Sequence, residues 1–157
     1  MPMIKAASNK KKKIFDTTDV AFSFSFFFLD TAWSIYGSRY FKVVTAPKDW
    51  NSAELDCQNQ GGNLASIHSA EEHAFLVSLV KTVGNINVWI GRSDAVKVSG
   101  SWIWSDGRKS QISKWGPGEP NNAGNGEHCA ELFVPHGFLW NDSICSLAKP
   151  YVCAKNV

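Results

Sequence analysis

The chain has 157 residues, of which 44% are hydrophobic and 19% are charged. This length fits one compact domain with a short extension, and the hydrophobic content excludes a wholly disordered chain. The net charge of +2 is misleading, because from Trp33 onward eleven Lys and Arg balance eleven Asp and Glu. A neutral body lacks the basic surface of a nucleic-acid-binding protein, and no apolar run approaches the roughly 18 residues of a membrane-spanning helix.

The first 32 residues differ from the rest of the chain. Lysines at positions 10–13 precede an apolar run at 20–29, which is the outline of a secretory signal peptide with small residues at 31–32 near a cleavage point. Acidic residues between the basic and apolar parts argue against it. The alternatives are a buried first strand after a disordered basic tail, or a mispredicted start of the gene. We therefore divide the chain into an extension, residues 1–32, and a domain, residues 33–157.

Helical patterns occupy only the front half of the domain. Residues 40–44 predict a short strand, and residues 51–54 resemble a capping box in which Asn51 begins a helix that ends at the glycines at 61–62. Ser69 begins a second amphipathic helix, which closes before Gly84.

The second half has the short apolar runs and turn signals of strands. We expect strands at residues 88–91, 102–104, 129–134 and 151–154, with a further segment at 137–140. A tight-turn signal follows the second of these runs at residues 105–107. Helices first and antiparallel strands later indicate an α+β fold.

Four cysteines lie within the domain, and none forms a C-x-x-C pair: Cys57, Cys129, Cys145 and Cys153. An even number in a small domain suits two disulfides and an oxidising, extracellular compartment. The spacing leaves all three pairings open, and four reduced, buried thiols are the alternative.

A stretch without periodicity separates the hairpin from the later strands. Residues 115–127 are rich in Gly, Pro and Asn, and a loop of this length in a small domain usually has a functional reason. This loop and a later strand carry five oxygen-bearing side chains: Glu119, Asn121, Glu127, Asn141 and Asp142. An all-oxygen set favours calcium or magnesium, and a flexible loop suits the larger calcium ion.

These motifs together resemble a C-type lectin-like domain over residues 33–155. The matching features are residues 89–91 (Trp-Ile-Gly), the Trp-rich hairpin, residues 119–121 (Glu-Pro-Asn), Glu127, residues 140–142 (Trp-Asn-Asp) and the last three cysteines. The resemblance implies a double-loop α+β fold with two helices, antiparallel sheets and a long calcium-binding loop. It also implies disulfides Cys57–Cys153 and Cys129–Cys145, a cis bond before Pro120, and Trp140 packed beneath the site.

The resemblance also implies a function. One calcium ion would be held by Glu119, Asn121, Glu127, Asn141 and Asp142, and two vicinal sugar hydroxyls would complete its coordination shell. The order Glu-Pro-Asn is similar to that of family members that select mannose, fucose or N-acetylglucosamine. The chain would then be a secreted carbohydrate-binding protein, and any homo-oligomer would use a surface that the sequence does not reveal.

Two alternatives to sugar binding remain. The domain is also similar to type II antifreeze proteins and to venom proteins of this fold, which bind ice or protein surfaces. Glu119 and Glu127 could form the carboxylate pair of a glycoside hydrolase, but both are better explained as metal ligands. We therefore expect no enzyme activity.

Some positions depart from the pattern of the family. His128 stands where calcium-rich members have Asp, and Val98 stands where a Glu could supply an auxiliary site, so we expect one calcium ion. Arg92 replaces the usual apolar residue after Trp-Ile-Gly. Asn141 also begins a glycosylation sequon, and we expect it to be unmodified because a glycan would remove a metal ligand.

Overall fold

The computed structural model describes residues 32–95 and 101–157. The expectations for residues 1–31, and that for Val98, lie outside these residues. No helix in the described part of the chain is long and apolar enough to cross a membrane.

A single sheet organises the unit from Trp33 to Val157. Its strands are β1 (Ser34–Tyr36), β2 (Arg39–Lys48), β3 (Asn63–Leu64), β4 (Val88–Ser93), β5 (Ile103–Trp104), β6 (Cys129–Phe133), β7 (Leu139–Ser143) and β8 (Lys149–Asn156). The main order is β1-β2-β8-β4-β6-β7, with β3 beside β8 and β5 beside β4. All pairings are antiparallel except that of β4 with β8, where Trp89 lies opposite Tyr151. The α+β class is confirmed, with one parallel contact that the sequence pattern did not predict.

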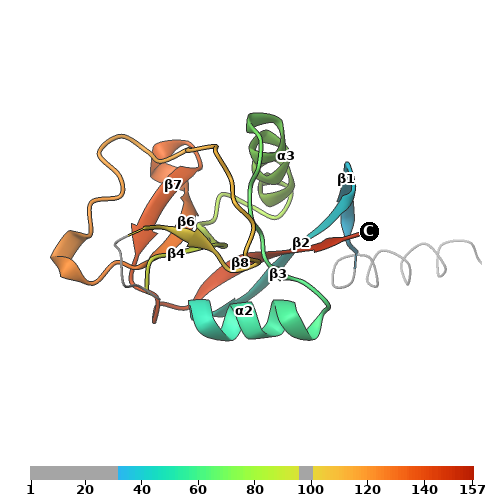
Figure 1. Cartoon of the computed structure of the whole chain (residues 1–157), viewed down its shortest axis with the longest axis horizontal. Coiled ribbons are helices and arrows are strands. Elements are labelled where there is room, and N and C mark those ends of the chain that lie inside the picture. The colour runs from blue at the N-terminus through green and yellow to red at the C-terminus, as the bar shows by residue number, and fades with distance from the viewer. Residues whose placement is uncertain (1–31, 96–100) are drawn as a thin grey trace, which may run out of the picture. The chain divides into compact units, whose positions relative to one another are not determined.

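Two α-helices flank the part of the sheet formed by β2 and β8. Helix α2 (Trp50–Asn59) and helix α3 (Ala70–Lys81) lie on opposite sides of these strands (Figure 1). The two ends of the folded unit meet in the sheet, because Arg39 near its start pairs with Asn156 near its end.

The start of α3 is as predicted, but the start of α2 is not. Ser69 accepts a hydrogen bond from the backbone N–H of Glu72 at 3.0 Å. The N-cap of α2 is Asp49, which accepts from the backbone N–H of Ser52 at 2.9 Å and from its hydroxyl at 2.7 Å, so the prediction of Asn51 was wrong. The earlier start makes Trp50 helical and places its ring in the core, where its indole N–H donates to the carbonyl of Ile90 at 2.9 Å. Burial of this ring favours the earlier cap.

Both disulfides are present with the pairing that the family resemblance implies. Cys57–Cys153 joins α2 to β8, and Cys129–Cys145 joins the start of β6 to the segment after β7. A cross-link over 96 positions, as in Cys57–Cys153, removes much of the freedom of the unfolded chain. The second disulfide holds the two ends of the β6–β7 hairpin together.

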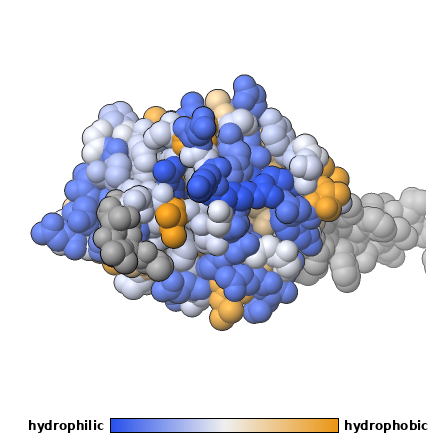
Figure 2. All heavy atoms as spheres, in the orientation of Figure 1, coloured by the Kyte–Doolittle hydropathy of each residue, from blue (hydrophilic) through white to orange (hydrophobic). Residues whose placement is uncertain are grey.

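Large apolar side chains on the surface are scattered. Those with more than half of their surface exposed include Ile35, Leu55 and Ile103. On the face drawn in Figure 2, hydrophobic residues form small separate patches among hydrophilic ones. The described apolar surface therefore forms no large continuous patch on this face.

The helix caps give the first prediction. Asp49→Ala and Ser69→Ala should each lower the free energy of unfolding by about 1 kcal/mol, because each leaves an N-terminal amide without its acceptor. Asn51→Ala, at an exposed position, should lower it by less than about 0.5 kcal/mol. Urea unfolding followed by circular dichroism measures all three, and a larger loss for Asn51→Ala than for Asp49→Ala would contradict the assignment of the cap.

Candidate functional site

A long connection between β5 and β6 carries three of the five predicted ligands. Within residues 105–128 the only helical turn is the short 3₁₀ segment η1 (Ala123–Asn125). The connection projects at the end of the sheet away from the C-terminus, beside β6 and β7 (Figure 1). The other two predicted ligands, Asn141 and Asp142, lie on β7. The fold thus brings the loop to the strand that carries the second half of the set.

Asp142 ties the loop to this strand. Its side chain is fully buried and accepts hydrogen bonds from the backbone N–H groups of Asn121 at 3.2 Å and Asn122 at 2.7 Å. The Glu119–Pro120 bond just before them is cis, as the resemblance implies. Asp142 thereby fixes the position of the Glu-Pro-Asn segment.

Glu119 and Asn121 contact each other within this segment. The Asn121 side-chain amide donates to one carboxylate oxygen of Glu119, and its backbone N–H donates to the other, both at 3.2 Å. Burial, a side-chain hydrogen bond with Asp142 and repulsion by the charge of Asp142 raise the pKa of Glu119 to about 7. The carboxylates of Glu119 and Asp142 are thus close together, and neither forms an ion pair with a described Lys, Arg or His.

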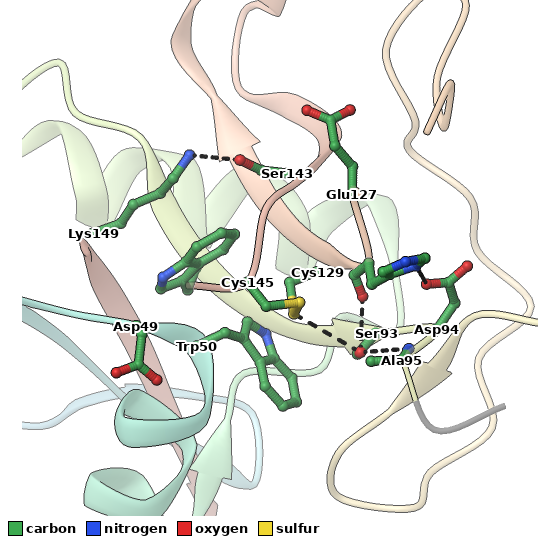
Figure 3. The surroundings of a disulfide bond; sticks show 12 residues. Asp49, Trp50, Ser93, Asp94, Ala95, Glu127, Cys129, Ser143, Cys145 and Lys149 are labelled. Atoms are coloured by element: carbon green, nitrogen blue, oxygen red, sulfur yellow. Dashed lines mark hydrogen bonds and ion pairs between the residues drawn. A yellow bond between two sulfur atoms is a disulfide. The ribbon is translucent and has the colours of Figure 1, made fainter. Parts of the chain in front are cut away.

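Glu127 closes the loop at its far end. Its carboxylate accepts from the backbone N–H of Ala123 at 3.0 Å, and its own N–H donates to the Asn122 side chain at 3.0 Å. Burial and the charges of Asp142 and Glu131 raise its pKa. Figure 3 shows this carboxylate pointing away from the Cys129–Cys145 disulfide. Glu127 belongs electrostatically to the same acidic group as Asp142.

Asn141 is held from the opposite side by two residues that the sequence analysis did not identify. Its amide donates to Glu131 of β6 at 3.0 Å, directly across the strand pair. Glu131 is 1% exposed and pairs with the Lys149 ammonium at 2.5 Å. Because one amide hydrogen is committed to Glu131, the amide group is fixed in orientation, and its oxygen is the atom left for a metal ion. A charged residue inside an otherwise apolar strand, Cys-Ala-Glu-Leu-Phe, was the available signal for Glu131.

The five oxygen donors fit a hard cation, but they are not all in contact with one another. Glu119, Asn121 and Asp142 are in direct contact, Glu127 joins them through Ala123, and the side chain of Asn141 bonds to Glu131 instead of to the loop. In the described residues no three His, Cys, Asp or Glu side chains form a metal cluster by themselves, so the set depends on its two amide oxygens. Carboxylate and amide oxygens, as in these five residues, are the kind of donor that calcium prefers.

Trp140 lies at the base of this region and is fully buried. Its ring packs edge-to-face against Trp104 at 5.5 Å and Trp115 at 5.8 Å between ring centroids. Its backbone N–H donates to the Lys114 carbonyl, and its carbonyl accepts from the Gly116 N–H, both at 2.8 Å. These bonds fix the first residues of the loop against β7, next to Asn141 and Asp142.

His128 is occupied by a different contact. Its ring nitrogen Nδ1 lies 2.8 Å from a carboxylate oxygen of Asp94, and its backbone carbonyl accepts from the hydroxyl of Ser93 at 2.8 Å. Both contacts are drawn in Figure 3. His128 therefore links the end of the loop to β4.

The family model described as Lectin C-type domain matches residues 46–155. The "Galactose-specific lectin nattectin" of Thalassophryne nattereri is 42% identical over 127 residues, which are 80% of this chain and 79% of that protein. The solved cow C-type carbohydrate-recognition domain of CD23, in the presence of an oligosaccharide, is 36% identical with a TM-score of 0.71 and covers 80% of this chain and 94% of its own. A calcium-independent type II antifreeze protein is 35% identical with a TM-score of 0.71, over 79% of this chain and 91% of its own.

The raised pKa of Glu119 gives the second prediction. Between its ordinary value of 4.5 and about 7, the folded state holds a proton there that the unfolded state has lost. By linkage, this group makes the free energy of unfolding fall as pH rises through that window. In protein kept in chelator, Glu119→Gln should therefore gain stability relative to the wild type on going from about pH 5 to about pH 8.

The measurement is urea unfolding at the two pH values. The pKa values of His68 and His73, which burial lowers, contribute the opposite slope. They do so equally in both proteins, so the difference between variant and wild type isolates Glu119. Glu71→Gln, at an exposed carboxylate on α3, is the matched control and should run parallel to the wild type. Parallel curves for Glu119→Gln would contradict the pKa assignment.

Proposed function

This chain belongs to the C-type lectin domain family, and from that premise we propose that it is a secreted lectin that binds sugars of the mannose type through one calcium ion. The family is non-enzymatic, and the chain is accordingly not an enzyme. Two disulfides suit an oxidising, extracellular compartment.

The bonds that Asp142 makes to the loop are the observation that carries the proposal. They hold Glu119 and Asn121 beside a buried carboxylate, at the edge of the strand that also carries Asn141. We propose that Glu119, Asn121, Glu127, Asn141 and Asp142 hold the ion. When bound, calcium would supply an electrophilic centre whose free coordination positions accept two neighbouring sugar hydroxyls.

The protein groups around those hydroxyls divide into acceptors and donors. The carboxylate oxygens of Glu119 and Glu127 accept hydrogen bonds from the sugar hydroxyls. The amide N–H groups of Asn121 and Asn141 donate hydrogen bonds to the hydroxyl oxygens. In the Glu-Pro-Asn segment the acceptor, Glu119, precedes the proline and the donor, Asn121, follows it. A Gln-Pro-Asp segment would place the donor first and the acceptor second. We propose on this ground that equatorial vicinal hydroxyls, as in mannose, fucose and N-acetylglucosamine, are preferred, although the relative nattectin is named galactose-specific.

Similarity to a calcium-independent type II antifreeze protein supports a second candidate. An ice-binding protein would use the same fold with no need for a sugar. Thermal hysteresis in a protein that binds no glycan in calcium would select this candidate over the first.

The third prediction concerns sugar selection. On a glycan array in calcium, mannose-terminated glycans should give the strongest signal, and chelator should remove it. The double variant Glu119→Gln/Asn121→Asp should shift the preference toward galactose by about tenfold or more, because it exchanges the donor and the acceptor that flank the hydroxyls. Glu71→Gln should bind like the wild type, and a wild-type array on which galactose dominates would refute the proposed preference.

The fourth prediction concerns Asn141. Asn141→Ala should lower calcium affinity by about tenfold or more in titration calorimetry, because it removes an oxygen ligand. Asn51→Ala, a surface Asn far along the chain from the loop, is the control and should leave the affinity unchanged. Mass spectrometry of secreted protein should show Asn141 free of glycan, since its amide nitrogen faces the buried Glu131. Full glycosylation of Asn141 together with calcium binding would contradict its role as a ligand.

A further inference from the structure

A cavity lies outside the predicted calcium site, beside β5. Its volume is about 390 Å³, and its lining consists of Arg92, residues 102–104 and residues 107–110. Three of these residues are cations, namely Arg92, Arg108 and Lys109, and none is a carboxylate. None of the five proposed calcium ligands contributes to it. The cavity therefore combines positive charge with two tryptophans and is separate from the metal site.

Arg92 occupies an unusual position at the wall of this cavity. Its guanidinium lies 5.1 Å from the Trp104 ring centroid, 5.6 Å from that of Trp115 and 5.1 Å from that of Trp140. Its Nε and Nη1 atoms are buried and have no hydrogen-bond partner. The electron-rich ring faces stabilise the cation, but none of the ion pairs within the described residues includes Arg92. No carboxylate in the described part of the chain pairs with its positive charge.

Arg39, which is more deeply buried than the partly buried Arg92, shows how this fold treats such a charge elsewhere. Arg39 donates to the Glu72 carboxylate at 2.7 Å and to the carbonyl and hydroxyl of Ser66 at 2.9 Å each. Arg92 has no equivalent of Glu72, and burial is the only cause that lowers its pKa. Since burying an unpaired charge is costly, an anion entering the cavity would stabilise Arg92 in the way that Glu72 stabilises Arg39.

The remaining lining indicates what would carry that anion. Trp102 is partly buried, and Ile103 is 51% exposed, so both offer apolar surface at the cavity. Arg108 and Lys109 are exposed, and Asp106 lies 3.9 Å from Arg108 and partly balances it. Lys109 therefore adds to the charge of Arg92. A sugar ring offers an apolar C–H face to tryptophan and can carry an acidic group at its edge.

We propose that this Arg92 cavity is a second, calcium-independent binding site that takes an acidic sugar, with its carboxylate or sulfate group against Arg92 and Lys109. The site is independent of the proposed function, because neither its lining nor its charge involves the calcium ligands. It extends binding to glycans that carry an anionic group.

The test uses the full chain in chelator, which removes any contribution from calcium. Glucuronic acid and galactose 6-sulfate are titrated against ¹⁵N-labelled protein, with the indole N–H signals of tryptophan as the readout, and glucose, galactose and sodium sulfate serve as comparison ligands. Both acidic sugars should shift indole signals saturably, the neutral sugars should not, and sodium sulfate should bind more weakly because it has no ring to contact Trp102.

Variants separate the charge from the packing. Arg92→Leu should reduce the affinity for the acidic sugars by about tenfold or more, as expected for loss of a charged hydrogen-bond donor. Lys109→Gln, at an exposed position, should reduce it about two- to fivefold, and Lys48→Gln, an exposed lysine outside the cavity, should leave it unchanged. Arg92→Lys keeps the charge and should retain part of the affinity.

Four results would overturn the proposal. These are no saturable shift with either acidic sugar, equal binding of acidic and neutral sugars, sodium sulfate binding as tightly as the sugars, and unchanged affinity in both Arg92→Leu and Lys109→Gln. Lys109→Gln keeps the test decisive if Arg92→Leu does not fold, because Lys109 is exposed and makes no contact with the core. Loss of calcium-dependent mannose binding would leave the result unaffected, so failure of the two proposals is distinguishable.

Discussion

The buried Asp142 carboxylate accepts hydrogen bonds from two consecutive backbone amides, those of Asn121 and Asn122. The arrangement of the loop at residues 115–127 depends on this contact. The loop is long and nearly without regular structure, so its own backbone bonds cannot fix its shape. A buried carboxylate that accepts from two consecutive backbone amides holds the Glu-Pro-Asn segment against the sheet. Asp142 therefore has two roles, as a structural tie for the loop and as a proposed ligand within it.

A cluster of tryptophans gives the two binding regions a common support. Trp140 packs against Trp104 and Trp115, and the same three rings surround the guanidinium of Arg92. The backbone of Trp140 leads directly to Asn141 and Asp142. The aromatic core thus contacts both the strand that carries two of the proposed metal ligands and the guanidinium at the wall of the Arg92 cavity. A rigid cluster of this kind allows both regions to be formed before any ligand arrives.

Local sequence signals were sufficient to predict much of the secondary structure. They were insufficient where contacts between distant parts of the chain determine the structure. Ser69 was predictable because no competing cap lies near it. Asn51 was predicted as the cap of the first helix because it begins a capping-box pattern, but the cap is Asp49, and burial of the Trp50 ring favours this earlier start. The parallel contact between Trp89 and Tyr151 joins segments far apart in the chain, and no local pattern reports it. The same holds for Arg92, whose three aromatic neighbours come from three different segments.

In the candidate site, too, residues within a sequence motif could be predicted, and residues joined only by the fold could not. Its five oxygen-bearing residues could be identified because they match a family motif, whereas Glu131 and Lys149 belong to no motif and become visible only in the fold. Their ion pair explains how a fourth carboxylate is tolerated beside Glu119, Glu127 and Asp142. Lys149 neutralises Glu131 at 2.5 Å, so a cation at the proposed site would face the charge of three carboxylates.

Glu131 is nearly fully buried, and an unpaired carboxylate there would be strongly unfavourable. With Lys149 in place, Glu131 instead holds the Asn141 amide through its second oxygen. That bond fixes which end of the Asn141 side chain is available to a ligand. The amide oxygen is then free for the cation, and the remaining amide hydrogen is free for a sugar hydroxyl. The ion pair of Glu131 with Lys149, across the strand pair from Asn141, thus sets both the charge of the proposed site and the orientation of one proposed ligand.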